Sequence, residues 1–207
     1  MTDSHDTRTR ILDVAEVLFS EQGLEGVSIR DITRKARVNL AAINYHFGTK
    51  DDLITAVFER RVVPLNQARL AALAAAEQAA GHRSPSLETI LEAFIRPALQ
   101  SSLQPTRGGS AFAKLFGRCL SEPSPEVEAL LQKQFAPLMV RMDAALRRAL
   151  PHLSPSDIFW RMKFTFGALH HWLLTKDKWR PPCTRGVTVE SQTRKLISYT
   201  AAGFRSV

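Results

Sequence analysis

The chain has 207 residues, of which 44% are hydrophobic and 23% charged, as in an ordinary soluble globular protein. No apolar run approaches the ~18 residues of a membrane span, and the polar start lacks the basic-then-apolar order of a signal peptide. Two cysteines are too few for a disulfide framework. We therefore expect a cytoplasmic protein with no membrane partner, whose Cys119 and Cys183 are reduced thiols acting as small buried hydrophobes.

The net charge of +8 and the pI near 10.0 suggest a nucleic-acid partner, but the position of the excess weakens that argument. Residues 1–63 hold 9 basic and 10 acidic side chains, so the excess falls in the C-terminal two-thirds. The local pattern is more informative, because residues 30–50 set five cations against the single Asp31. Such a patch can meet phosphates even in a neutral domain. The cations are Arg30, Arg34, Lys35, Arg37 and Lys50.

The first third of the chain predicts four helices in close succession. Each start is marked by residues that cap helices, and Gly23 and Gly48 end the first and third helices. The start signals are Ser-x-x-Asp at 28–31, Asn39, and Thr-Lys-Asp-Asp at 49–52. The first predicted helix contains the apolar stripe from Ile11 to Phe19. The other three cover residues 29–36, 40–47 and 50–80.

Proline and glycine breaks divide the rest of the chain into further helices. Ser124-Pro125 and Ser154-Pro155 each place a capping serine before a proline at the first helical position. No strand pattern competes with the helical periodicity. The predicted fold class is all-α with about nine helices, the later ones at 87–104, 110–121, 125–150, 155–178 and 187–205.

The helices at 29–36 and 40–47 are joined by only three residues, which is the spacing of a helix-turn-helix. The second helix of that motif enters the major groove, and small or apolar residues at 40–42 let its backbone approach the bases. Asn44 is then the best reader of base edges, while Tyr45, His46 and Lys50 can reach phosphates. Ile43 and Phe47 are expected to face the core with Leu18, Val27 and Ile32.

This stretch resembles the DNA-binding domain of the TetR family of bacterial repressors. The resemblance rests on Gly23, the two-helix motif, the sequence Tyr45-His46-Phe47 and Lys50. It covers roughly residues 5–65 and implies a DNA-binding domain there, with a helical ligand-binding and dimerisation domain over 66–207. One departure is Arg37, where the family often has Gly; a positive φ there would cost about 1 kcal/mol. The family's DNA contacts fall on Ser28, Arg30, Asn39, Leu40, Ala41, Asn44, Tyr45, His46 and Lys50.

The resemblance also implies a homodimer that forms through the last two long helices, at about 155–178 and 187–205. Residues 155–178 independently carry two apolar faces, so one can pack in the subunit and the other against a partner; core packing alone is the alternative. The first face holds Phe159, Met162, Phe166, Leu169, Trp172 and Leu173, and the second holds Trp160, Phe164 and Ala168.

The resemblance implies a repressor that is released from a palindromic DNA operator when a small, mainly apolar effector binds. Excess cations, together with a likeness of 39–47 and Phe159-Trp160-Arg161 to fatty-acid-responsive members, also suggest an anionic acyl effector. The cations are Arg96, Arg107, Lys114, Arg118, Arg141, Arg147 and Arg148. The candidate ligand-binding residues are Phe94, Phe112, Leu115, Phe116, Leu120, Phe135, Met139, Phe166 and His170.

No catalytic residues, cofactor or metal site are predicted. His170 and His171 point about 100° apart on a helix, so they are poorly placed to share a metal. The sequence lacks Gly-x-Ser-x-Gly, a phosphate-binding glycine loop and a carboxylate pair for acid–base work. Two alternatives to a ligand-responsive repressor stay open: a thiol enzyme or hydrolase using Cys119, and a DNA-binding activator or architectural protein without a ligand.

Overall fold

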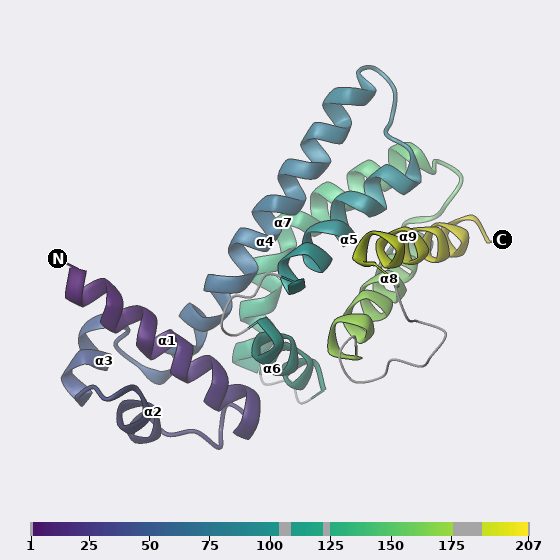
Figure 1. The fold of residues 1–207 in the computed structure, drawn as a ribbon. Helices are drawn as coiled ribbons and strands as arrows, with labels where there is room; N and C mark the ends of the chain where they lie inside the picture. Colours follow the sequence, from purple (N-terminus) through teal and green to yellow (C-terminus); the bar gives the residue numbers. More distant parts are fainter. Residues whose placement is uncertain (1, 104–108, 122–124, 176–187, 207) are drawn as a thin grey trace. The chain divides into compact units, whose positions relative to one another are not determined.

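The computed structural model describes residues 2–103, 109–121, 125–175 and 188–206 of the chain (Figure 1). Within these ranges it forms nine helices and no strand, so the predicted all-α fold is confirmed. No helix in the described ranges combines the length and the hydropathy needed to cross a membrane. Several sequence features lie outside the described residues, namely Arg107, Gly108, Ser124, the break at 180–182 and Cys183.

The helix ends agree with the predicted ones to within one or two residues wherever both are described. The local capping residues explain this agreement, because they fix each helix start without help from distant parts of the chain. The helices are α1 (Thr2–Gln22), α2 (Ile29–Ala36), α3 (Leu40–His46), α4 (Lys50–Ala80), α5 (Leu87–Leu103), α6 (Gly109–Ser121), α7 (Pro125–Ala149), α8 (Pro155–Thr175) and α9 (Val189–Arg205).

The chain divides into two compact units. The first consists of Met1–Pro64 and Pro105–Gln134, and the second of Leu65–Gln104 and Phe135–Val207. Both α4 and α7 therefore pass from one unit into the other. Residues 105–134, which the sequence groups with the C-terminal domain, cluster with the N-terminal unit.

The core of the first unit is built on the apolar stripe of α1, which packs against α2, α3 and α6. Ile43 of α3 is fully buried. From α6, Leu115 is fully buried, and Phe112 meets Phe58 of α4 edge to face with ring centroids 5.6 Å apart. The three helices α1 to α3 and the turn before α2, called the head below, also bury Ile11, Leu12, Ala15, Leu18, Phe19, Val27, Ile32 and Ala36, which include the predicted core positions Leu18, Val27 and Ile32.

The second unit packs α9 against α5 and α8 around a core that contains Phe94, Leu91, Ile197 and Phe204. Arg69 is buried in this unit, where its Nε donates to the Phe94 carbonyl at 2.9 Å and its guanidinium lies 4.2 Å from the centroid of the Phe94 ring. Burial lowers the pKa of Arg69 to about 9. The side chain thus ties α4 to α5 within the second unit.

Helix α8 buries one face along its length, but Phe159 does not belong to it. Its buried stripe is Ile158, Met162, Thr165 and Leu169, at the spacing of one helix face. Phe159, predicted on the same face as Met162 and Leu169, is instead 58% exposed, because the buried stripe begins one residue earlier at Ile158. The edge of the Phe159 ring packs on Trp160, with centroids 5.5 Å apart.

Candidate nucleic-acid interface and effector-binding residues

The start of α2 is fixed by a capping box between Ser28 and Asp31. The Ser28 hydroxyl accepts from the Asp31 N–H at 3.2 Å, and the Ser28 N–H donates to Asp31 Oδ2 at 3.1 Å. The hydrogen bond from the Ser28 side chain, followed by that from its backbone, lowers the pKa of Asp31. Both polar groups of Ser28 are therefore engaged in starting the helix, and its contact with DNA stays a prediction.

The turn between α2 and α3 is tight because Arg37 adopts a left-handed conformation, with φ 53° and ψ 49°. Among the described residues it is the only one other than glycine with a positive φ. The Val38 N–H donates to the Thr33 carbonyl at 3.1 Å and closes the end of α2. The strain suspected at Arg37 from the sequence is therefore present in the backbone.

The recognition helix α3 turns an uncharged face outward. Asn39 caps its start, accepting from the Ala42 N–H at 2.8 Å. Ile43 is buried, whereas the residues on the opposite side are exposed, and this includes 54% of Leu40 and 82% of Tyr45. The exposed residues Leu40, Ala41, Asn44 and Tyr45 recur at one-turn spacing, so they lie on one face of the helix.

Three aromatic side chains follow one another at the end of α3. The rings of Tyr45 and His46 meet edge to face with centroids 5.0 Å apart, and those of His46 and Phe47 are 6.1 Å apart. Phe47 was predicted to be a core residue but is only half-buried. Its ring contacts the Arg8 guanidinium, which lies 5.2 Å from the ring centroid and belongs to an exposed side chain.

A second capping box starts α4 two residues after Phe47. The Thr49 hydroxyl accepts from the Asp52 N–H at 3.1 Å and donates to Asp52 Oδ2 at 2.6 Å. The hydrogen bonds that Asp52 Oδ2 accepts, first from the Thr49 hydroxyl and then from the Thr49 N–H, lower the pKa of Asp52. Lys50 is the first residue of α4 and is half-exposed. The structure thus holds Lys50 a few residues from the end of the recognition helix.

The nine predicted DNA-binding residues all belong to the first unit, where seven are exposed and His46 and Lys50 are half-buried. None of them lies in the core. Arg30, Lys35 and Arg37 are exposed on the same segment, while Arg34 is paired with Asp31 at 2.5 Å.

The nine predicted ligand-binding residues are divided between the two units. Phe112, Leu115, Phe116 and Leu120 belong to the first unit; the other five belong to the second. Phe94 and Leu115 are fully buried and serve packing, whereas Leu120 is 42% exposed. A half-buried group remains in the second unit, where the Phe166 ring stacks on His170 at 6.1 Å and meets Phe135 edge to face at 6.3 Å. Met139 is also half-buried there.

The cations that suggested an anionic effector are mostly paired with carboxylates. Arg96 contacts Glu92 at 2.6 Å and Glu190 at 2.5 Å. Glu77 accepts from both Arg141 and Arg148, and Asp143 accepts from Arg147 at 2.6 Å. These pairs occupy four of the seven cations, which weakens the argument from charge, and an anionic effector stays a prediction.

The surfaces of α8 and α9 carry large apolar side chains that are exposed within a single chain. Beside them lies an open groove of about 460 Å³ along both helices, lined by Thr165, Ala168, Thr200, Gly203 and others. Arg161 borders it and donates to the Phe204 carbonyl at 2.6 Å. The exposed side chains are Phe159, Trp160, Phe164 and Tyr199.

Models of two known families match this chain. The model described as bacterial regulatory proteins of the tetR family matches residues 11–57, which contain the two-helix motif. The model described as the tetracyclin repressor-like C-terminal domain matches residues 92–203, more than half of the chain. The chain belongs to the TetR family. The resemblance seen in the sequence is thereby confirmed, and because this family and the matching relatives are transcriptional regulators, the chain is not an enzyme.

Known relatives match this TetR-family chain over less than a third of its length, for example over 57, 63 and 56 residues. The regulator AcrR of Shigella flexneri is 42% identical over 57 residues, which is 28% of this chain and 26% of AcrR. The chain thus matches about a quarter of that relative's length. A TetR-family regulator from Bordetella parapertussis has a TM-score of 0.68 at 17% identity over 93% of each chain. SmeT, in a complex with triclosan, has a TM-score of 0.63 at 20% identity, over 95% of this chain and 90% of that one.

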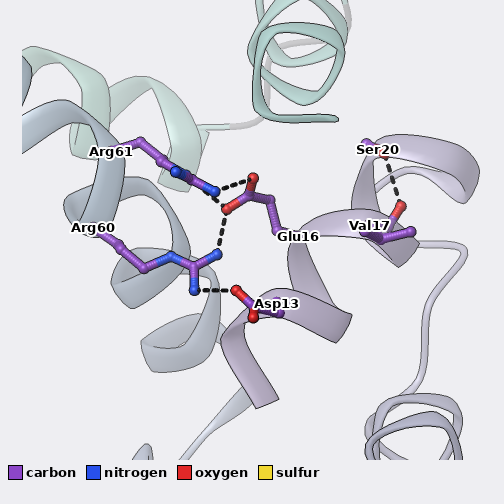
Figure 2. Close-up of polar contacts among 6 residues, drawn as sticks. All are labelled: Asp13, Glu16, Val17, Ser20, Arg60 and Arg61. Atoms are coloured by element: carbon purple, nitrogen blue, oxygen red, sulfur yellow. Dashed lines mark hydrogen bonds and ion pairs between the residues drawn. The ribbon is translucent and has the colours of Figure 1, made fainter. Parts of the chain in front are cut away.

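One feature of the TetR-type head was not foreseen from the sequence. Figure 2 shows the Glu16 carboxylate of α1 between the guanidinium groups of Arg60 and Arg61 of α4. Glu16 accepts from Arg60 Nη2 at 2.5 Å and from Arg61 Nε and Nη2 at 3.0 Å each. Asp13 binds the other side of Arg60 at 2.7 Å. The only sequence signal is an acidic residue inside the apolar stripe of α1, and its partners are 44 and 45 residues away.

Proposed function

We propose that this chain is a homodimeric repressor that binds a palindromic DNA operator and releases it when a small, mainly apolar effector binds. DNA binding is assigned to residues 5–65, and effector binding and dimerisation to residues 66–207. The observation that carries the proposal is the outward face of α3, which is uncharged, largely apolar and exposed.

The dimensions and chemistry of α3 suit the major groove. Its seven residues at about 1.5 Å each make a rod of about 10 Å, and the groove is about 12 Å wide. The exposed amide of Asn44 can form paired hydrogen bonds with an adenine edge, while Leu40 and Ala41 can contact a thymine methyl group. These three residues are proposed to select the base sequence.

The residues around the two ends of α3 are proposed to bind the backbone phosphates. At its start these are Asn39 and Arg30, with Ser28 placing the helix that carries Arg30. At its end they are Tyr45, His46 and Lys50, the last aided by the N–H groups that open α4. Such contacts fix the register of the protein on the duplex, and they carry no sequence information themselves.

The exposed apolar surface of α8 and α9 supports dimerisation through these two helices. Aromatic side chains exposed over more than half of their surface, such as Phe164 and Tyr199, would be removed from water when a second copy covers them, and burying apolar surface is favourable. A dimer also suits a short recognition helix, because two copies can read two half-sites about one DNA turn apart.

The half-buried group Phe135, Met139, Phe166 and His170 is proposed to contact the effector in the second unit. These side chains are apolar or aromatic and only partly buried, in contrast to the fully buried Phe94. SmeT, which has the same fold, forms a complex with the small molecule triclosan. Because α4 begins at Lys50 and continues into the second unit, we propose that it connects effector binding to the DNA-binding residues.

Release by the effector needs a difference in its affinity for two shapes of the protein. A hundredfold loss of operator affinity corresponds to a coupling free energy of about 2.7 kcal/mol. Duplex selection from a random library, followed by anisotropy titration against a scrambled duplex at moderate salt, tests the proposal. We expect a palindromic sequence to be enriched and bound at least a hundredfold more tightly than the scrambled duplex. Equal affinity for all duplexes, including DNA upstream of the gene, would refute the function.

A further inference from the structure

The side chain of Arg8 lies beside the recognition helix, although the predicted interface does not include it. Arg8 belongs to α1 and is exposed. Its guanidinium carbon is 5.2 Å from the centroid of the Phe47 ring, within the range of a cation–π contact. Phe47 is the residue that ends α3, so this contact holds a positive charge at the end of the recognition helix.

The charge of Arg8 is not neutralised within the described part of the chain. Positions three and four residues away on α1 hold Ser4, His5, Ile11 and Leu12, none of which is acidic. Arg10, in contrast, has Asp6 at helical spacing, with a nitrogen–oxygen distance of 3.9 Å. Many of the arginines in the described residues, such as Arg34 and Arg60, also face carboxylates. Arg8 therefore differs from them in keeping its charge available to a partner.

A cation–π contact with Phe47 is compatible with hydrogen bonding by Arg8. A guanidinium is planar, so it uses its face against an aromatic ring while the N–H donors at its edge stay directed outward. That arrangement matches the two oxygens of a phosphate, and the ring reduces the side-chain freedom that is lost on binding. A lysine at this position would keep the charge but would lose the fork of donors.

The neighbours of Arg8 are the side chains proposed to meet DNA. The ring of Phe47 is followed by those of His46 and Tyr45, with centroid separations of 6.1 and 5.0 Å. Lys50 begins α4 three residues after Phe47. A phosphate held by Lys50 or Tyr45 would therefore have Arg8 on the same end of α3.

We propose that Arg8 is a further DNA-binding residue, which contacts a backbone phosphate of duplex DNA and is positioned by stacking on Phe47. The proposal rests on the proposed function, since it assumes that α3 lies against a duplex. Each neutralised phosphate contributes about 0.9 to the slope of log affinity against log salt concentration. A dimer would lose two such contacts, so Arg8→Ala should lower the slope by about 1.8. At 0.1 M salt this corresponds to up to about a sixtyfold loss of affinity, which vanishes near 1 M.

The test is a salt titration of the full chain on a duplex of random sequence, where phosphate contacts dominate binding. Arg10→Ala is the matched control, because it removes a charge from the same helix at a residue that is already paired. Arg8→Lys keeps the charge and should keep the slope within about half a unit of the wild-type value. Circular dichroism verifies that each variant is folded at the titration temperature.

Two results would overturn the role of Arg8. In the first, the slope of Arg8→Ala equals that of the wild type; in the second, Arg10→Ala lowers the slope equally, which would mark a general charge effect. These results are separate from a failure of the proposed function, which would appear as a wild-type protein without preference for any operator. The random-duplex titration also remains decisive for Arg8 in that case.

Discussion

Replacing Glu16 by Gln tests how strongly the head of the protein depends on the buried ion cluster (Figure 2). The substitution keeps the volume of the side chain but removes its charge and turns an NH₂ group towards arginine donors. Glu16 is fully buried, and both of its oxygens accept hydrogen bonds from Arg60 and Arg61. Removing one partner of a buried ion pair typically costs about 3–5 kcal/mol, because the other charge stays uncompensated.

The structure favours the lower end of that range. The side chains of Arg60 and Arg61 are 22% and 21% exposed, so water can compensate part of the lost interaction. We expect a decrease of about 3 kcal/mol in the free energy of unfolding, a large share of the 5–15 kcal/mol typical of a folded protein. Urea denaturation followed by far-UV circular dichroism measures it.

The same cluster supplies a matched control. Asp13 binds Arg60 at 2.7 Å, but its side chain is 40% exposed. Asp13→Asn should therefore cost less than about 1 kcal/mol, as exposed ion pairs do. The reasoning is refuted if Glu16→Gln stays within about 1 kcal/mol of the wild type, or if Asp13→Asn is equally destabilising.

Three further predictions concern single side chains. Arg37→Gly should raise the free energy of unfolding by about 1 kcal/mol, because glycine adopts the left-handed conformation without strain; a destabilised variant in urea would contradict the backbone assignment. Burial, and secondarily the charge of His171, lowers the pKa of His170, so the unfolded chain binds a proton first as the pH falls. Stability should then decline below about pH 6.5, and a pH series of melting curves should show a weaker decline for His170→Gln. Phe164→Glu should give a folded monomer in sedimentation velocity, whereas an unchanged dimer would exclude this face of α8.

The local features of the fold were predictable because their causes lie within a few residues. The pairs Ser28–Asp31 and Thr49–Asp52 start their helices through hydrogen bonds three residues apart. The buried side of α3 was predictable in the same way, since Ile43 follows from helical periodicity alone.

The features that sequence reasoning missed depend on residues far apart in the chain. Glu16 finds its arginines 44 and 45 residues later, and the ring of Phe58 meets Phe112 of α6. Phe47 was placed in the core because its type and spacing fit there, but it is only half-buried and contacts a cation from α1. Charge counting also could not reveal that Glu77 and Glu190 pair with arginines, so the anionic effector stays a prediction.

The specificity of the outward face of α3 can be measured directly with two variants. The measurement is the affinity of Asn44→Ala and Lys50→Ala for a set of duplexes in which each operator base pair is changed in turn. Asn44→Ala should lose the preference at one base pair per half-site, about 1–3 kcal/mol in discrimination. Lys50→Ala should weaken binding to every duplex by the same factor. If Asn44→Ala keeps the wild-type preference at every position, α3 does not read the bases in the way proposed.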